Sequence, residues 1–349
     1  MELLTATRMQ TVLACPRRHY WRYECGLRRQ ESGDALRFGS AWHRAMEALS
    51  LGQCPEDAYR AGLGSAQEID ELAAATLWGL LAGYATHYGS DPAVQRAVEV
   101  LHREVEFETA IDGSRTFKAA GKIDGLGRLA DGRLCVVEYK TTSSSLDADS
   151  DYWLRLRADT QILMYVAAAR AMGWDIATVV YDVTRKPAIR PRQLPRLDAD
   201  GLKVVVDNAT GERVLLANGK PRQAAGEGQT LQTDQEAPEA FGQRLYEDAT
   251  ANPGFYFCRR EVPVLSDDLE EFADLRVQVS RMILDRRGQQ RKMDAATPWR
   301  AWPRHVNGMQ CPGCEFAGFC LQNSVPDLAH PPAGYRVGEA HSELSNGAM

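Results

Sequence analysis

Two carboxylates and a lysine form the first candidate site of this chain. Asp124 lies in GKIDG and Glu138 in VVEYKTT, on two apolar segments joined by a short Asp-Gly turn. Side chains at positions i and i+2 of a strand share a face, so Glu138 and Lys140 point the same way. The turn brings the second strand back beside the first and places Asp124 near Glu138. Two converging carboxylates beside an ammonium group can bind a hard divalent cation and a phosphate.

This set of residues suits phosphodiester hydrolysis. The reaction needs a neutralised phosphate, an activated water and a stabilised leaving oxygen, and a divalent cation with a lysine can supply all three. Taken singly, Asp124 is an ordinary turn residue, and Glu138 with Lys140 is an ordinary cross-strand pair. Their joint presence at the end of a long apolar strand favours a metal-dependent hydrolytic site.

Three further residues extend this site. His43 lies on a predicted helix after Gly39 and offers a neutral imidazole to the same metal. Gln161 and Tyr165 are four residues apart on the predicted helix that follows the two strands, so their side chains lie on one helix face. Each is common by chance alone, and together they strengthen the prediction.

Four cysteines form a second candidate site. Thiolates hold zinc ions and iron–sulfur clusters in roughly tetrahedral arrays, and both remain open from spacing alone. One cysteine lies near the start of the chain and three near its end, so a shared metal would join the two ends. The set is Cys15, Cys311, Cys314 and Cys320, and the isolated cysteines are Cys25, Cys54, Cys135 and Cys258.

The composition is that of a soluble globular protein of 349 residues with a net charge of −6. No stretch approaches the roughly 18 uninterrupted apolar residues of a membrane-spanning helix, and the N-terminus lacks the apolar core of a secretory signal. We therefore expect a cytoplasmic protein with reduced cysteines.

The net charge gives no general affinity for nucleic acid, but residues 1–44 are rich in arginine. We expect Arg17, Arg18 and Arg22 to contact a phosphate backbone. The neighbouring aromatic side chains either stack on unpaired bases or pack in the core, and packing is favoured for Trp21. These neighbours are Tyr20, Trp21 and Tyr23.

The elements that position these residues are read from periodicity and turn signals. We expect helices over 7–24 and 37–50, the second capped at Ser40, then a helical insert over the active face. A strand over 103–110 precedes the two motif strands, and the next helix ends at Gly173 before an apolar strand. A protruding hairpin with a turn near 208–211 and a mobile Gly- and Gln-rich loop follow. Helices over 237–250 and 267–288 lead to the cysteine segment.

These elements predict a single domain over 1–325 and a tail over 326–349 that is ordered only by docking. Within the domain the predicted parts are basic N-terminal helices, the helical insert, the catalytic core, the hairpin insert, and the C-terminal helices with the cysteine segment. Their respective bounds are 1–50, 51–101, 102–183, 184–240 and 241–325.

In chain order, GSAWH, GKID, VEYKTT and QILMY resemble the motifs of the RecB-like branch of the PD-(D/E)XK nucleases. The cysteine set resembles the iron–sulfur version found in AddB-type helicase-nuclease subunits and CRISPR-associated exonucleases. The middle and C-terminal segments, including the hairpin insert and NPGFYFCRREV, resemble phage- or prophage-encoded single-domain members more than helicase-fused ones. The resemblance covers nearly the whole chain and is weakest across 55–100 and 190–235. The chain has Ile123 where the superfamily name has proline, a change that RecB-like members tolerate. The resemblance implies an α/β fold, with a central mixed sheet flanked by helices, a helical insert and a C-terminal Fe–S staple.

The resemblance also implies roles for the site residues. His43, Asp124 and Glu138 would bind Mg²⁺ or Mn²⁺, with the Tyr139 carbonyl as a further ligand. Lys140 would orient or activate the attacking water, and Gln161 and Tyr165 would position DNA or the lysine. A [4Fe-4S] cluster would be held by Cys15, Cys311, Cys314 and Cys320.

The preferred hypothesis is a metal-dependent deoxyribonuclease, an exonuclease on DNA ends or single strands in recombination, repair or phage DNA processing. Its expected partners are DNA and recombination or repair proteins, with no membrane. Two alternatives remain: a non-catalytic DNA-end-binding module stapled by a four-cysteine metal site, and a nuclease acting on RNA or branched DNA. The sequence does not indicate an oligomeric state.

Overall fold

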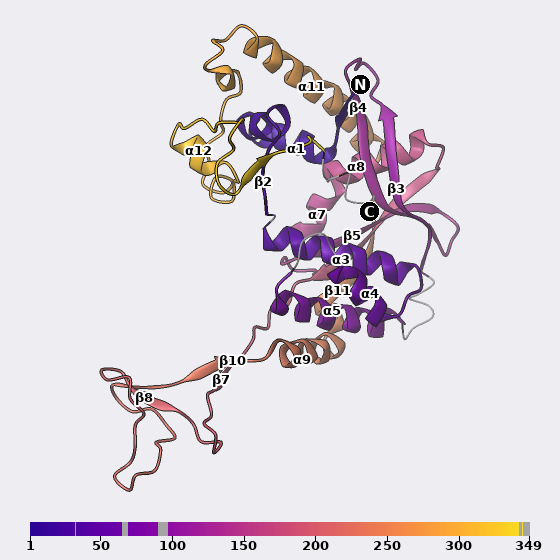
Figure 1. Cartoon of the computed structure of the whole chain (residues 1–349). Helices are drawn as coiled ribbons and strands as arrows, with labels where there is room; N and C mark the ends of the chain where they lie inside the picture. Colours follow the sequence, from indigo (N-terminus) through magenta and orange to yellow (C-terminus); the bar gives the residue numbers. More distant parts are fainter. Residues whose placement is uncertain (32, 65–68, 90–96, 342–343, 345–349) are drawn as a thin grey trace.

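A mixed β-sheet forms the centre of the computed structural model, which describes residues 1–31, 33–64, 69–89, 97–341 and 344 (Figure 1). Strand β4 pairs antiparallel with β3 and β5 and parallel with β1, while β6 pairs parallel with β5 and antiparallel with β11. This mixed sheet flanked by helices confirms the predicted α/β class. The strands are β1 (Glu2–Leu4), β3 (Val98–Ala110), β4 (Phe117–Leu129), β5 (Leu134–Thr142), β6 (Ile176–Arg185) and β11 (Phe257–Pro263).

The turn between β4 and β5 forms as its Asp-Gly pair predicts. Gly132 has a φ of +92°, a left-handed conformation that glycine adopts without steric cost. The Asp131 carboxylate accepts a hydrogen bond from the backbone N–H of Arg133 at 3.1 Å. The turn therefore sets β4 and β5 in the register on which the candidate site depends.

Each face of the sheet is covered by its own hydrophobic core. One core joins Val136 of β5 to helices α1, α7, α8 and α11. The other joins Val137 and Tyr139 of β5 to helices α3, α4, α5 and α9. The bounds of these helices are α1 (Ala6–Ala14), α3 (Asp34–Ser50), α4 (Pro55–Leu63), α5 (Glu71–Gly89), α7 (Asp151–Arg157), α8 (Thr160–Ala171), α9 (Pro238–Ala251) and α11 (Ser266–Gln290).

The N-terminal helices differ in detail from the prediction. The expected helix over 7–24 is interrupted at Cys15, whose φ is −159°, because a residue before proline disfavours helical backbone. The chain continues as α2 (Pro16–His19), a π-helical turn (Tyr20–Glu24) and the short strand β2 (Leu27–Arg29). The next helix begins at Asp34 after Gly33, so the predicted cap at Ser40 is wrong.

The predicted helical insert is only partly helical. Helices α4 and α5 form within it, but residues 98–101 already belong to β3, and 65–68 and 90–96 lie outside the described residues. These helices pack on the sheet face that carries Tyr139, whereas Glu138 and Lys140 alternate to the opposite face. The insert therefore lies on the side of α3, which carries His43, and away from Glu138 and Lys140.

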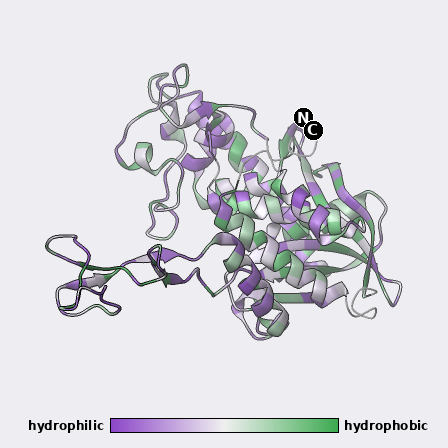
Figure 2. Ribbon diagram, turned by 60° about the horizontal axis from the view of Figure 1, so that its bottom comes forward, coloured by the Kyte–Doolittle hydropathy of each residue, from purple (hydrophilic) through white to green (hydrophobic). Residues whose placement is uncertain are grey.

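A narrow β-arm projects from the body between β6 and α9 (Figures 1 and 2). The predicted turn near 208–211 forms, with the Gly211 N–H donating to the Asp207 carbonyl at 2.8 Å. The following Gly- and Gln-rich segment, predicted as a loop, instead carries two short strands, because its backbone pairs with the first half of the arm. The arm strands are β7 (Gln193–Pro195), β8 (Val205–Asp207), β9 (Gln229–Leu231) and β10 (Thr233–Gln235).

The C-terminal part returns to the N-terminal helices. The predicted helices over 237–250 and 267–288 appear as α9 and α11. The tail contributes β12, which pairs antiparallel with β2. The remaining elements are α10 (Pro253–Tyr256), the 3-10 turn Pro298–Ala301, α12 (Ala317–Leu321) and β12 (Tyr335–Val337). Across the described ranges, no helix combines the length and apolar character needed to cross a membrane.

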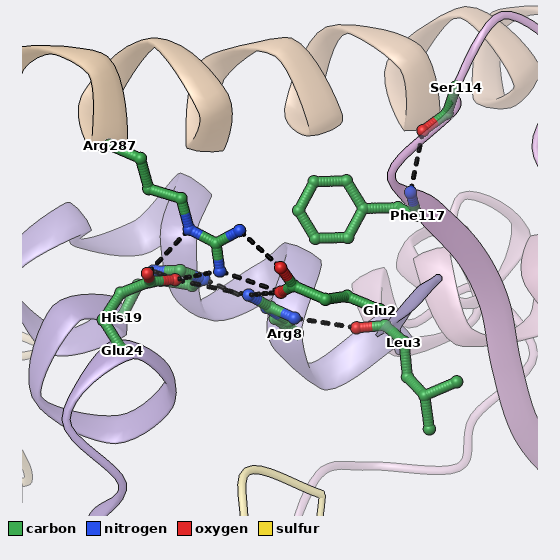
Figure 3. A network of polar contacts seen from close by, with 8 residues as sticks. All are labelled: Glu2, Leu3, Arg8, His19, Glu24, Ser114, Phe117 and Arg287. Carbon is green, nitrogen blue, oxygen red and sulfur yellow. Dashed lines mark hydrogen bonds and ion pairs between the residues drawn. The ribbon is translucent and has the colours of Figure 1, made fainter.

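A partly buried ion-pair network joins the first strand to the N-terminal helices and to α11 (Figure 3). Arg8, whose side chain is 2% exposed, donates to the Leu3 carbonyl at 2.8 Å and lies 3.3 Å from carboxylate oxygens of both Glu2 and Glu24. Arg287 of α11 contacts the same two carboxylates at 2.6 and 2.7 Å. The network therefore fixes β1, α1, the π-helical turn and α11 together.

Candidate active site and cysteine cavity

Asp124 lies where strands β4 and β5 stop pairing. Their ladder ends at Gly125 opposite Val137. Asp124 is the adjacent residue on β4, and its Oδ2 accepts a hydrogen bond from the backbone N–H of Tyr139 at 3.0 Å. A side chain therefore replaces the strand partner at this point. The carboxylate is thereby held at the opening between the two strands.

Glu138 and Lys140 lie together on β5, as predicted. Lys140 Nζ is 3.0 Å from Glu138 Oε1, and the Glu138 side chain is only 2% exposed. The second oxygen, Oε2, is buried and has no hydrogen-bond partner among the described residues. A buried carboxylate oxygen without a partner is unfavourable unless the site takes a ligand there.

The electrostatics of this pair follow from burial and charge. Burial, and then the negative charge of Asp124, raises the pKa of Glu138 to about 7. Burial lowers the pKa of Lys140, but the carboxylates of Glu138 and Asp159 outweigh it, and the net pKa lies above its usual range. Lys140 is therefore an ammonium group at neutral pH, suited to a phosphate oxygen or a water.

His43 reaches this site from α3. Its Nδ1 lies 3.3 Å from Asp124 Oδ2. Burial lowers the pKa of His43, but the negative charges of Asp124, Glu138 and Glu104 outweigh burial and raise the pKa to about 9. His43 is therefore in direct contact with Asp124 and paired with its charge.

Glu104 on β3 is an acidic neighbour that sequence reasoning missed. Its φ of +48° is rare for a residue with a side chain, and it forms an ion pair with Lys122. Burial raises the pKa of Glu104, and the charge of Asp124 contributes to the same rise. The alternating pattern of its strand carried no signal for this conformation.

Gln161 and Tyr165 connect to Lys140 through hydrogen bonds. The lysine Nζ donates to Gln161 Oε1 at 3.2 Å, and Gln161 Nε2 donates to the Tyr165 hydroxyl at 2.9 Å. The two side chains thus share one helix face, as the four-residue spacing predicts, and the structure places that face beside Lys140 of β5.

Asp159 is the second residue that sequence reasoning missed. It caps α8 by accepting the Gln161 N–H at 2.9 Å, and its other oxygen lies 3.3 Å from Lys140 Nζ. One side chain therefore orients both the helix and the lysine. An aspartate two residues before Gln161, at a helix start, was the available signal.

The glycine of the GKID motif is required by close packing. A Cβ at Gly121 would lie 2.7 Å from the Phe107 ring and 3.4 Å from the Tyr165 ring. Ile123, at the position of the family's proline, is fully buried in the core. The motif thus combines a packing constraint with the carboxylate of Asp124.

The donor set at this site fits a hard divalent cation, which prefers carboxylate oxygens. Asp124 and Glu138 converge, and the buried Glu138 Oε2 has no hydrogen-bond partner in the part of the chain that the structure describes. In this structure the two carboxylates contact His43 and Lys140, and across the described ranges no three acidic, histidine or cysteine side chains form a ready metal-binding array. The ligand roles expected for these residues stay a prediction.

The predicted cysteine set lines one cavity between the two ends of the chain. Backbone N–H groups point at two of the sulfurs: His305 donates to Cys15 Sγ at 3.5 Å and Asn307 to Cys311 Sγ at 3.4 Å. Such donors favour thiolate sulfur. The cysteines that share this cavity are Cys15, Cys311, Cys314 and Cys320.

The arginines expected to contact DNA have partners within the protein. Arg17 donates to the Trp302 carbonyl at 2.7 Å, and Arg18 and Arg22 contact Glu315 at 3.5 and 3.3 Å. Their DNA contacts stay a prediction. The neighbouring aromatic residues are buried, which favours packing over base stacking: Tyr20, Trp21 and Tyr23 are 6%, 2% and 6% exposed.

Comparisons with known proteins identify the family of this chain. The chain is 24% identical over 248 residues to an ATP-dependent helicase/deoxyribonuclease subunit of Streptococcus equi subsp. zooepidemicus, in strains H70 and MGCS10565. That match covers 66% of this chain and 23% of the relative, so the chain spans less than a quarter of those relatives. A solved structure titled "Crystal structure of SSO0001" is 14% identical, with 71% of this chain and 75% of that chain covered and a TM-score of 0.23. The model of the PD-(D/E)XK nuclease superfamily matches residues 3–321, and the chain therefore belongs to that superfamily.

Proposed function

We propose that this chain is a Mg²⁺- or Mn²⁺-dependent deoxyribonuclease, acting as an exonuclease on DNA ends or single strands. The observation that carries the proposal is the buried Oε2 of Glu138, which has no hydrogen-bond partner among the described residues and lies beside the charge of Asp124. The Lys140 ammonium lies 3.0 Å from the other oxygen. Such a site favours a cation and an anionic phosphate together.

The site residues have distinct roles in this proposal. Asp124, Glu138 and His43 bind the divalent cation, with the Tyr139 carbonyl as a further ligand. When bound, the cation would neutralise the scissile phosphate and lower the pKa of a water. Lys140 orients that water or stabilises the phosphate through its positive charge. Gln161, held by the Tyr165 hydroxyl at 2.9 Å, fixes the position of the lysine.

We further propose a [4Fe-4S] cluster on Cys15, Cys311, Cys314 and Cys320. The shared cavity and the backbone N–H groups aimed at two of the sulfurs support it. Hydrolysis needs no electron transfer, so the cluster acts as a structural staple between the chain ends. Iron and sulfide analysis of anaerobically purified protein separates this from the alternative of zinc.

Within a cell, we propose a cytoplasmic role in recombination, repair or phage DNA processing. The name of the streptococcal relatives, helicase/deoxyribonuclease, supports a partner in DNA processing. The single nuclease domain over 1–325 and the tail over 326–349 are part of the same proposal.

Cleavage of end-labelled linear and closed circular single-stranded DNA tests the exonuclease assignment. We expect loss of the linear substrate in Mg²⁺ or Mn²⁺, none in EDTA, and survival of the circle. Cleavage of the circle would instead indicate an endonuclease, and preferential cleavage of RNA or branched DNA would change the substrate.

A further inference from the structure

A second cavity opens directly beside the candidate active site. It has a volume of about 470 Å³ and lies between the end of β5, helix α7 and the start of α8. Pockets for small ligands span roughly 300–1,000 Å³. The cavity is open to the surface and is large enough for one nucleotide.

The cavity is continuous with the site through Asp159. This residue lines the cavity, and its Oδ2 lies 3.3 Å from Lys140 Nζ. Thr142, which also lines it, lies two residues after Lys140 on the same face of β5. A chain bound at Lys140 would therefore enter this cavity with its next nucleotide.

Arg155 supplies a cation for a phosphate group. In the described part of the chain its side chain donates one hydrogen bond, from Nε to the Asp151 carbonyl at 3.3 Å. The terminal amino groups of its planar guanidinium are thus available, and this fork of donors suits two oxygens of a phosphate group. The negative charge of Asp159 is already paired with Lys140.

Tyr152 contributes its ring to the cavity, while its hydroxyl is buried beside Thr142 and does not face the open space. Its ring and the buried side chain of Leu156 give the cavity an apolar wall, and the Gln10 amide adds a polar group. An apolar wall with a few polar groups suits the base and sugar of a nucleotide.

We propose that this cavity binds one unpaired nucleotide of the DNA strand, adjacent to the scissile phosphate. Arg155 holds its phosphate, and Tyr152, Leu156 and Gln10 contact its base and sugar. This inference rests on the proposed nuclease function and deepens it, because a base that packs on the apolar wall is unpaired, so the pocket favours a single-stranded or frayed end over an intact duplex.

Binding of dTMP to the full-length protein in EDTA tests the pocket without any cleavage. We expect the wild type to bind dTMP, and Arg155→Gln to weaken binding by about tenfold, because one charge-assisted contact to phosphate is lost. Thermal melting checks that each variant is folded.

Arg157→Gln is the matched control. Arg157 is on the same helix but forms an ion pair with Asp268 at 3.2 Å and does not line the cavity. We expect this variant to bind dTMP like the wild type. Equal affinities of Arg155→Gln and Arg157→Gln, no binding by the wild type, or inorganic phosphate binding as tightly as dTMP would overturn the proposal.

Different results would refute the nucleotide pocket and the nuclease function. Binding of dTMP that depends on Arg155, without any cleavage of DNA, would sustain the pocket and refute the nuclease function. Metal-dependent cleavage without an effect of Arg155→Gln on dTMP binding or on the KM for a short single strand would refute the pocket alone.

Discussion

Asp124 accepts a hydrogen bond from the backbone N–H of Tyr139 at 3.0 Å, at the point where β4 and β5 cease to pair. The contact joins the carboxylate of the GKID motif to the backbone of the VEYKTT motif. The opening between the strands and the position of Asp124 beside Glu138 are therefore parts of one local arrangement.

Substitution of Asp124 separates its structural and chemical roles. Asp124→Asn keeps an oxygen acceptor for the Tyr139 N–H, whereas Asp124→Ala leaves that N–H unpaired. We expect the alanine variant to lose about 1–3 kcal/mol of unfolding free energy and the asparagine variant to lose much less. Both should lose cleavage, measured on linear single-stranded DNA. Near-normal cleavage by Asp124→Asn would remove this carboxylate from the chemistry.

Asp159→Asn tests the residue that orients Lys140. Asparagine still caps α8 by accepting the Gln161 N–H, but it removes the negative charge 3.3 Å from the lysine. We expect an almost unchanged melting temperature and a kcat lowered by about tenfold, as for other residues that orient a catalytic group. Asp268→Asn, which removes the partner of Arg157 on the surface, is the control. Equal kcat values for the two variants would contradict the role of Asp159.

His19 makes the stability of the protein dependent on pH. Burial, and then the positive charges of Arg8 and Arg287, lowers its pKa from 6.5 to about 2. Between these values the unfolded chain binds a proton that the folded chain does not, so stability rises with pH in this range. We expect the unfolding free energy to fall below pH 6.5 by up to about 1.4 kcal/mol per pH unit. Denaturant unfolding from pH 5 to 7 should show a smaller slope in His19→Gln, and an unchanged slope would contradict this assignment.

Cys314→Ser tests the metal site at the chain ends. We expect this variant to lose bound iron, melt at a lower temperature and become less soluble. Cys54→Ser is the control, because Cys54 is exposed and distant in sequence from the predicted set. Iron, sulfide and zinc are measured by elemental and colorimetric analysis. Full iron content in Cys314→Ser, or stoichiometric zinc in the wild type, would contradict the proposed cluster.

Much of the site arrangement could be predicted because its signals are local. The Asp-Gly turn sets two apolar strands side by side, and alternation along β5 brings Glu138 and Lys140 to one face. The four-residue spacing of Gln161 and Tyr165 likewise predicts their shared helix face, and the 2.9 Å hydrogen bond between them agrees with it. Periodicity and turn chemistry act over a few residues, so the sequence carries them directly.

The remaining features depend on contacts between distant segments. Glu104 takes a positive φ within a strand whose pattern is ordinary, and its environment includes Lys122 of β4. Asp159 contacts Lys140 only after α8 packs beside β5. In the arm, the segment around β9 has few apolar residues but pairs through its backbone, which no side-chain pattern reports. These three features therefore depend on tertiary contacts, which local sequence patterns do not report.

We propose that the protein hydrolyses phosphodiester bonds at the site formed by Lys140 and its neighbouring carboxylates. The most direct measurement is the initial rate of Mg²⁺-dependent cleavage of linear single-stranded DNA by the wild type, Lys140→Ala and Lys118→Ala, where Lys118 is a β4 lysine paired with Glu108 on the surface. We predict that Lys140→Ala remains folded and loses at least about a hundredfold in rate, whereas Lys118→Ala cleaves like the wild type. Equal rates for all three proteins, or no cleavage by folded, metal-loaded wild type, would contradict the account.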